Sequence, residues 1–233
     1  MNSGLDSALE KMAVAVATKH VANECLLGLG SGSTVARFAK ALGERVRKEG
    51  ITLKVVPSSL QAWLLAQENS LQLYTDSAHC PASIDVAVDG ADQVATTSRA
   101  MIKGGGGALF KEKIILTAAR HTFILGDQDK FVPELKRSVP VEVSQFALSS
   151  AQKQIKSTFV DSEPVLRRLD KGYPFYTESG NVILDCIFKK PISDPVASER
   201  QLKMIPGVVE AGIFNVPVDA FYKANHDGTF ESF

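Results

Sequence analysis

Residues 25–34, with the sequence CLLGLGSGST, indicate the fold class of this 233-residue chain. The first six of these residues are typical of a short buried strand that ends in glycines. The apolar side chains that follow recur at spacings of three and four, as on one face of a helix: Val35, Phe38, Leu42 and Val46. A buried strand that leads directly into an amphipathic helix is a unit of a parallel sheet covered by helices.

Helical and strand patterns alternate on both sides of this stretch. An amphipathic helix is predicted before it, from the spacing of Leu5, Leu9, Met12 and Val16. After it, a helix is predicted at 61–68, and strands are predicted at 53–56, 71–74, 84–88, 101–102 and 122–125. The alternation predicts an α/β fold with a Rossmann-like, mainly parallel sheet and helices on both faces.

The pattern changes near Pro133. From there the predicted order is strand, helix, strand, strand, helix, strand, at 139–143, 144–155, 163–169, 181–188, 195–204 and 207–214. This order is that of a split, ferredoxin-like α+β unit. We therefore expect a smaller ferredoxin-like domain at residues 137–210 and a larger Rossmann-like domain formed by residues 1–136 and 211–233.

Composition and charge exclude several classes of protein. Hydrophobic residues make up 45% and charged residues 22%, which is ordinary for a globular protein. Lys plus Arg and Asp plus Glu both number 26, so no net charge draws the chain to nucleic acid or to an anionic membrane. No apolar run approaches the length of a membrane span, and the first residues lack the pattern of a secretory signal. The three cysteines form no CxxC pair, which favours reduced, structural thiols in a cytoplasmic protein.

Unusual residues gather where four predicted strands end. The segments are GLGSGST at 28–34, VDGAD at 88–92, KGGGG at 103–107 and GDQDK at 126–130. Open parallel sheets bind ligands at the carboxyl ends of their strands. Each segment alone is a weak signal, and their convergence points to one functional site.

The first of these segments, residues 28–34, is suited to an anion. Glycines between a strand and a helix let the backbone approach a phosphate, and the N–H groups of the helix N-terminus can bind it. The spacing does not match GxGxxG, and no Gly-Lys-Ser/Thr follows, so a dinucleotide or a P-loop is a poor fit. A small phosphate, such as a sugar phosphate, is the functional interpretation. The alternative is a plain strand–helix turn capped by Ser33 or Thr34.

Asp89 and Asp92 follow the next strand, and three interpretations stay open for them. They could be solvated acids in an Asp-Gly turn, metal ligands, or groups that hold sugar hydroxyls. Neither a neighbouring histidine nor a third carboxylate supports a metal. The histidines have no ligand spacing, and we expect all four to be structural or surface residues: His20, His79, His121 and His226.

The stretch MIKGGGGALFKEK, at 101–113, has the most specific composition of the chain. If a helix begins near Gly107, Glu112 lies on one stripe with apolar side chains, where partial desolvation makes a carboxylate a better base. The alternative is an exposed Lys-Glu-Lys helix face. The glycine run favours the first interpretation, because it clears space for a ligand beside Lys103 and Glu112.

The chain resembles ribose 5-phosphate isomerase of the A type. The resemblance covers about residues 28–214, in the segments GLGSGSTV, VDGADQV, MIKGGGGALFKEK, GDQDK, VPVEV, GNVILD and IPGVVEAGIF. It implies a metal-independent aldose–ketose isomerase that interconverts D-ribose 5-phosphate and D-ribulose 5-phosphate in the pentose phosphate pathway. It also implies two domains, no cofactor, and a homo-oligomer, either a dimer or a tetramer.

The resemblance further implies which residues act. Glu112 is the implied proton acceptor. The chemistry of the reaction then suits Lys103 to stabilise the enediolate oxygen, and Asp89 and Asp92 to hold the sugar or open its ring. The implied substrate contacts are Ser31, Gly32, Ser33, Thr34, Asp89, Gly90, Ala91, Asp92, Lys103, Gly104, Gly105, Gly106 and Lys130. Three positions depart from the family pattern.

The positions at which the chain departs from the family pattern are Ser31, Gln93 and the N-terminal lysine. Ser31 stands where threonine is frequent, and Gln93 replaces a frequent acid. The family often has an N-terminal lysine near the phosphate; Lys11 lies in the corresponding part of this chain, and we do not include it in the site.

Two other classes of protein share this broad architecture. A sugar-phosphate sensor of a transcription regulator would bind without turnover, but the balanced charge argues against DNA binding. Acyl-CoA transfer through a glutamate is related by fold analogy alone. Formation of ribulose 5-phosphate in a coupled assay would distinguish an isomerase from a sensor and from an acyl-CoA transferase.

Overall fold

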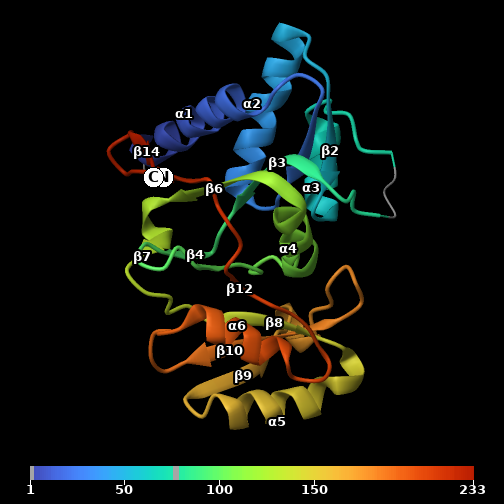
Figure 1. Ribbon diagram of the computed structural model, residues 1–233, viewed down its shortest axis with the longest axis vertical. Helices are drawn as coiled ribbons and strands as arrows, with labels where there is room; N and C mark the ends of the chain where they lie inside the picture. The colour runs from blue at the N-terminus through green and yellow to red at the C-terminus, as the bar shows by residue number, and fades with distance from the viewer. Residues whose placement is uncertain (1–2, 76–78) are drawn as a thin grey trace. The chain divides into compact units, whose positions relative to one another are not determined.

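The computed structural model describes residues 3–75 and 79–233, and these form two compact units (Figure 1). The first unit comprises Met1–Ala91, Lys111–Phe131 and Val216–Phe233. The second comprises Asp92–Phe110 and Val132–Asn215. In this division, residues 92–110 group with the smaller unit, whereas the domains expected from the sequence place them in the larger one. Those domain boundaries stay a prediction.

The first unit is built on a six-stranded sheet with the order β14-β13-β6-β3-β1-β2. The strands are β1 (Cys25–Leu29), β2 (Leu53–Pro57), β3 (Ile84–Gly90), β6 (Ala119–Asp127), β13 (Ala220–Ala224) and β14 (Phe230–Ser232). All neighbours are parallel except β13 and β14, which are antiparallel. The mainly parallel sheet predicted from the alternating pattern is therefore confirmed.

Helices cover both faces of this sheet. They are α1 (Ser3–His20), α2 (Ser33–Glu49), α3 (Leu60–Glu68) and α4 (Leu109–Ala118), with a short helix η1 (Gln128–Lys130) after β6. One apolar cluster joins α1, α2 and α3 to the face that carries Leu27, Val88 and Leu125. Gly28 points to the other face, where the side chain of Ile115 on α4 takes the space that a Cβ would need.

Glycines bound α2 at both ends. Gly32 occupies the N-cap position with a φ of 99°, and Gly50 ends the helix in the left-handed conformation with a φ of 68°. The N–H of Gly50 donates to the carbonyl of Val46. Gly32 has no side chain to accept from the first turn, so neither Ser33 nor Thr34 caps the helix as the alternative interpretation expected.

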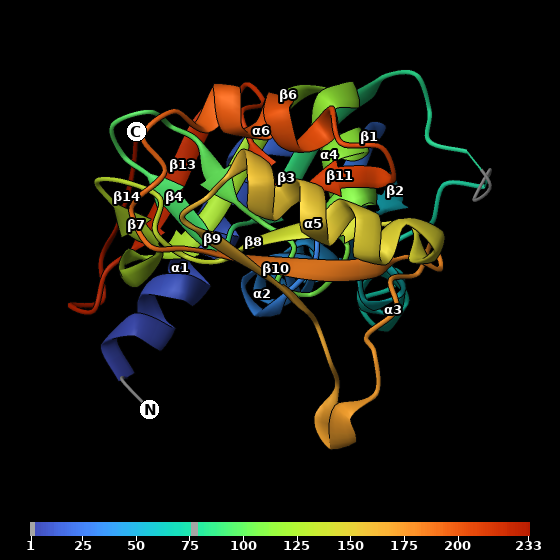
Figure 2. The same ribbon diagram turned by 90° about the horizontal axis from the view of Figure 1, so that it is seen from below.

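The second unit contains the ferredoxin-like arrangement. Its elements are β8 (Val139–Val143), η2 (Gln145–Ala147), α5 (Leu148–Thr158), β9 (Ser162–Leu166), η3 (Asp170–Gly172), β10 (Val182–Phe188), α6 (Pro195–Lys203) and β11 (Val208–Ala211). The strands form an antiparallel sheet with the order β11-β8-β10-β9. Figure 2 shows α5 lying across this sheet and the segment between β9 and β10 projecting away from it. The predicted ferredoxin-like order of strands and helices is confirmed.

A small sheet has the order β12-β5-β4-β7, and all of its residues except Phe131 belong to the second unit. Its strands are β4 (Gln93–Ala95), β5 (Met101–Ile102), β7 (Phe131–Val132) and β12 (Ile213–Phe214). The strand predicted at 207–214 is thus divided, and Gly212 lies between β11 and β12. Its N–H donates to the carbonyl of Pro140 and its carbonyl accepts from the N–H of Lys103. A Cβ there would lie 2.5 Å from the Lys103 oxygen, so only glycine fits between these two segments.

The strand predicted at 71–74 is a further difference. Leu73 forms a single parallel bridge with Val55 on the edge strand β2, and the pairing does not extend further. One bridge leaves most of the segment outside the sheet. Among the described residues, no helix is both long and apolar enough to cross a membrane.

Candidate active site

The carboxyl ends of β1, β3 and β6 meet at one edge of the sheet in the first unit. These three strands are adjacent and parallel, so their last residues lead into neighbouring loops. Ser31–Thr34 follow β1, Asp89 and Gly90 end β3 with Ala91 directly after them, and Lys130 ends the short helix after β6, as the sequence pattern indicated. The first unit therefore brings these three predicted segments together, at the position where ligands bind in such sheets.

Asp89 holds the loop after β1 from the end of β3. Its side chain is 2% exposed. Its Oδ1 accepts hydrogen bonds from the N–H of Gly90 at 2.7 Å and from the N–H of Ser31 at 3.3 Å. A Cβ at Gly30 would lie 1.9 Å from the same oxygen, so glycine is required where the loop passes the carboxylate. Asp89 is a buried acid, so its interpretation as a solvated acid in an Asp-Gly turn is wrong.

A group of polar side chains after β2, not predicted from the sequence, supports the same loop. The Oγ of Ser31 lies 2.9 Å from the Oγ of Ser58 and 2.6 Å from the Oγ of Ser59. Gln61 accepts from the N–H of Gly32 at 3.0 Å. The signal was present in the sequence, because Ser58 and Ser59 directly follow the strand beside β1.

Four predicted phosphate ligands at this edge have side-chain donors: Ser31, Ser33, Thr34 and Lys130. Thr34 lies in the first turn of α2 and is 7% exposed. Lys130 ends η1, and its Nζ lies 3.8 Å from Asp127 Oδ2. Lys11 donates to the carbonyl of Gly228 at 3.1 Å, so the structure places it at the turn between β13 and β14. The helix N-terminus and the ammonium group of Lys130 are suited to a dianion.

Glu112 is buried, as the helical stripe predicted. It lies in the first turn of α4 and is 6% exposed. Lys113 beside it is also 6% exposed, whereas Lys111 faces solvent. The alternative interpretation, an exposed Lys-Glu-Lys helix face, is therefore wrong, because Glu112 and Lys113 are both buried. A carboxylate in such surroundings is suited to proton transfer.

The second unit holds Asp92, Lys103 and the four glycines. Lys103 follows β5 and is 3% exposed, with its Nζ 5.6 Å from the centre of the Phe214 ring. Asp92 is half-buried, and its Oδ2 accepts from the N–H of Gly105 at 2.7 Å. In this unit, a buried lysine therefore directly precedes the glycine run, and a carboxylate is hydrogen-bonded to it.

The four glycines form a turn, closed by a hydrogen bond from the N–H of Gly107 to the carbonyl of Gly104 at 3.0 Å. Gly104 and Gly107 have φ values of 105° and 83°, which disfavour other residues. A Cβ at Gly107 would lie 2.6 Å from the Phe175 ring, and one at Gly105 would lie 2.7 Å from Asp92 Oδ1. At Gly106 no atom lies within 4 Å of that position. Backbone conformation or close contacts therefore explain why glycine is needed at 104, 105 and 107. Gly106 borders open space.

The histidines and cysteines play no part in these groups. His20, His121 and His226 contact Tyr222, Asp219 and Asp129, and His79 is exposed. The cysteines are free thiols: Cys25, Cys80 and Cys186. Burial raises the pKa of Cys25 to about 11 and that of Cys186 to about 12, so both are protonated at neutral pH. Within the described ranges, no three His, Cys, Asp or Glu side chains form a group that could hold a metal ion.

Comparisons with known proteins agree with the resemblance of the motifs. The model of the family described as ribose 5-phosphate isomerase A, or phosphoriboisomerase A, matches residues 54–228. Ribose-5-phosphate isomerase A of Methanosarcina acetivorans is 41% identical over 231 residues, which cover 99% of this chain and 96% of that protein. The protein of the same name from Bacillus mycoides is 38% identical, over 88% of this chain and 90% of its own.

Solved structures give the same result. Ribose 5-phosphate isomerase A from Methanocaldococcus jannaschii aligns with a TM-score of 0.89 and 33% identity, over 99% of each chain. A D-ribose-5-phosphate isomerase in complex with phospho-erythronic acid aligns with a TM-score of 0.87 and 36% identity, over 97% of each chain. From these matches over nearly the whole sequence, the chain belongs to the ribose 5-phosphate isomerase A family.

Proposed function

We propose that this protein interconverts D-ribose 5-phosphate and D-ribulose 5-phosphate through an enediolate, as an aldose–ketose isomerase of the pentose phosphate pathway. The observation that carries the proposal is the stretch 101–113, in which a buried lysine, a glycine turn and a buried glutamate follow one another. Family membership supports the same reaction.

A phosphorylated sugar suits the groups that the first unit brings together. We assign the phosphate to the N-terminus of α2, at Ser31, Gly32, Ser33 and Thr34, and to Lys130. N–H groups, hydroxyls and an ammonium group are all donors, and a dianion needs donors. The complex of a similar isomerase with phospho-erythronic acid, a phosphorylated sugar acid, supports this class of substrate.

Glu112 and Lys103 perform the chemistry in this proposal. The reaction takes a proton from C2 of the open-chain aldose and returns it to C1, while a proton moves from the C2 hydroxyl to the C1 oxygen. Glu112 accepts and returns the carbon-bound proton. Lys103 stabilises the negative oxygen of the enediolate, and its burial strengthens that interaction relative to water.

Asp89, Asp92 and the glycine turn complete the set of substrate contacts. We assign to Asp89 and Asp92 the holding of sugar hydroxyls and the opening of the ring, with Gly90 and Ala91 as backbone contacts. Gly104, Gly105 and Gly106 offer backbone to the substrate, and the open space at Gly106 suits a ligand. Two boundaries between the units fall inside these sequence motifs. One lies between Ala91 and Asp92 in the motif 88–92, and the other between Phe110 and Lys111 in the motif 101–113.

The proposed mechanism uses no metal and no cofactor, because a base and a cationic group supply both functions that the enediolate route needs. We also propose that the protein is a homo-oligomer, a dimer or a tetramer, as the family resemblance implies. We propose the cytoplasm as the location of the protein, because free cysteines without a CxxC pair suit a reducing compartment.

A coupled assay for ribulose 5-phosphate tests the proposal directly. Purified protein and ribose 5-phosphate should give ribulose 5-phosphate, and the reverse reaction should give ribose 5-phosphate. A protein that binds the sugar phosphate without turnover would instead be a sensor. Activity on an acyl-CoA with none on the sugar phosphate would favour acyl transfer.

A further inference from the structure

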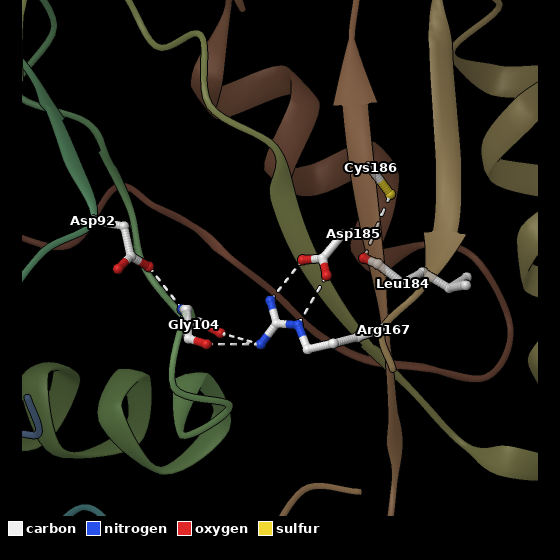
Figure 3. A network of polar contacts seen from close by, with 7 residues as sticks. Asp92, Gly104, Arg167, Leu184, Asp185 and Cys186 are labelled. Carbon is white, nitrogen blue, oxygen red and sulfur yellow. Dashed lines mark hydrogen bonds and ion pairs between the residues drawn. The ribbon is translucent and has the colours of Figure 1, made fainter. Parts of the chain in front are cut away.

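Arg167 and Asp185 form a two-pronged ion pair in the second unit (Figure 3). Nε of Arg167 donates to Asp185 Oδ2 at 2.8 Å, and Nη2 donates to Oδ1 at 2.6 Å. The two side chains are only 15% and 26% exposed. Such a parallel pair fixes the plane of the guanidinium as well as its position.

The backbone on both sides of this pair is held firmly. Asp185 lies in β10 between Leu184 and Cys186, whose side chains are fully buried. Arg167 follows β9, and its N–H donates to the carbonyl of Ile183 at 2.8 Å. The guanidinium is therefore anchored to the sheet at both its main chain and its side chain.

The remaining nitrogen of Arg167 binds the glycine turn. Nη1 donates to the carbonyl of Gly104 at 2.9 Å and to the carbonyl of Gly105 at 3.0 Å (Figure 3). The ion pair with Asp185 uses the other two nitrogens and does not need this contact. The contact made by Nη1 restrains a run of glycines, which are the residues with the largest backbone freedom.

These bonds set the direction of two peptide groups. The Gly104–Gly105 peptide is held at both ends, because Arg167 binds its carbonyl and Asp92 accepts from its N–H at 2.7 Å. The Gly105–Gly106 peptide is held at its carbonyl. Because the peptide is trans, its N–H at Gly106 points away from Arg167. Gly106 is also the glycine that borders open space.

We infer that Arg167, held by Asp185, is a positioning residue for the isomerase reaction, which orients the Gly104–Gly106 backbone toward the substrate. This inference rests on the proposed function, in which that backbone contacts the sugar phosphate. Arg167 acts through the turn and touches no reacting atom. Lysine cannot replace it, because one ammonium group cannot bind a carboxylate in two places and reach two carbonyls in a fixed plane.

The test uses three variants and a neighbouring control. Arg167→Lys keeps the charge, whereas Arg167→Met with Asp185→Leu removes both charges and leaves neither unpaired. Asp185→Asn keeps Arg167 but weakens its anchor. Arg168→Met is the control, because Arg168 is exposed and binds the carbonyl of Gly172.

We expect kcat/KM for ribose 5-phosphate to fall about 10- to 100-fold in Arg167→Lys and in the double variant, as for a small misplacement of binding groups. Asp185→Asn should fall between these and wild type, and Arg168→Met should match wild type. Hydrogen exchange of the peptide that covers 103–110 should become faster in the Arg167 variants, while peptides from β8 and α5 stay unchanged. That local change separates positioning from a general loss of structure.

The outcomes are distinct. Wild-type kcat/KM in folded Arg167→Lys and in the folded double variant would overturn the inference. If the double variant does not fold, Arg167→Lys and its exchange pattern decide alone. Inactive wild-type protein would instead reject the proposed function, whatever the variants do.

Discussion

The carboxylate of Asp89, at the end of β3, accepts a hydrogen bond from the N–H of Ser31, in the loop after β1, at 3.3 Å. One buried acid therefore holds the backbone of the proposed phosphate loop and also stands in the set proposed to contact the sugar. Its two roles can be separated by substitution.

We predict that Asp89→Asn keeps phosphate binding and loses activity. Asparagine retains the Oδ1 acceptor for Ser31 and Gly90 but lacks the charge, so kcat should fall roughly 10–100-fold, as for one hydrogen bond to a charged group. Inhibition by inorganic phosphate should stay at the wild-type level. Asp89→Ala removes the acceptor as well, and it should weaken both kcat and phosphate inhibition. Equal effects of the two variants on phosphate inhibition would contradict the loop-holding role.

The glycine turn gives a second prediction, because Gly106 and Gly107 are glycines for different reasons. Gly107→Ala should lower the free energy of unfolding by roughly 1–3 kcal/mol, since the φ of 83° is strained and the Cβ meets Phe175. Gly106→Ala places its Cβ in open space, so stability should stay near wild type while KM for ribose 5-phosphate rises. Thermal unfolding and steady-state kinetics on both variants check this. A wild-type KM in Gly106→Ala would show that the substrate does not approach this glycine.

Local patterns predicted most of the fold. The strand–glycine–helix stretch at 25–34 and the ferredoxin-like order after Pro133 were predicted from the spacing of apolar residues. This spacing can be read from residues that are close together in the sequence. The stripe that places Glu112 among apolar residues is equally local, and its 6% exposure confirms it. The segment 71–74 has a strand-like composition, but pairing depends on a distant edge strand, and only Leu73 forms a bridge.

Contacts between distant residues could not be predicted in this way. Arg167 is 63 positions from Gly104, and Gln61 is 29 positions from Gly32, and no spacing rule links such pairs. Ser58 and Ser59 could have been predicted, because they directly follow the strand next to β1. The pair Arg167–Asp185 was not, because its two strands must first align in the sheet.

A third prediction concerns the phosphate. Thr34→Ala and Lys130→Ala should each weaken binding of ribose 5-phosphate about tenfold or more, because each removes a donor worth roughly 1.5–3 kcal/mol. Lys40→Ala is the matched control, since Lys40 is an exposed lysine farther along α2. Titration calorimetry or KM gives the measurement. Wild-type affinity in both Thr34→Ala and Lys130→Ala would place the phosphate elsewhere.

Metal removal is the fourth test. Dialysis against EDTA should leave the rate unchanged, because Glu112 and Lys103 supply the base and the cationic stabiliser in the proposed route. The control is the same dialysis followed by addition of Mg²⁺, Mn²⁺ or Zn²⁺, which should not raise the rate. Loss of activity that one of these ions restores would reject the metal-independent mechanism.

The sharpest prediction concerns Glu112. Glu112→Gln keeps the size and hydrogen-bonding reach of the side chain but cannot accept a proton from carbon. Lys103 and the glycine turn remain, so affinity for ribose 5-phosphate should persist while isomerisation falls by roughly the 10²–10⁴-fold typical of losing a general base. The same change at Glu68, an exposed glutamate at the end of α3, is the matched control and should have no effect.

Exchange of the C2 hydrogen with solvent distinguishes the base from a binding group. This exchange should disappear in Glu112→Gln together with product formation, because both need the same proton abstraction. If turnover stayed near normal, the base would have to be Asp89 or Asp92. If affinity collapsed while bound substrate still reacted, Glu112 would be a binding residue. Its burial in the first turn of α4, five residues after the glycine turn, favours the first result, with affinity kept and chemistry lost.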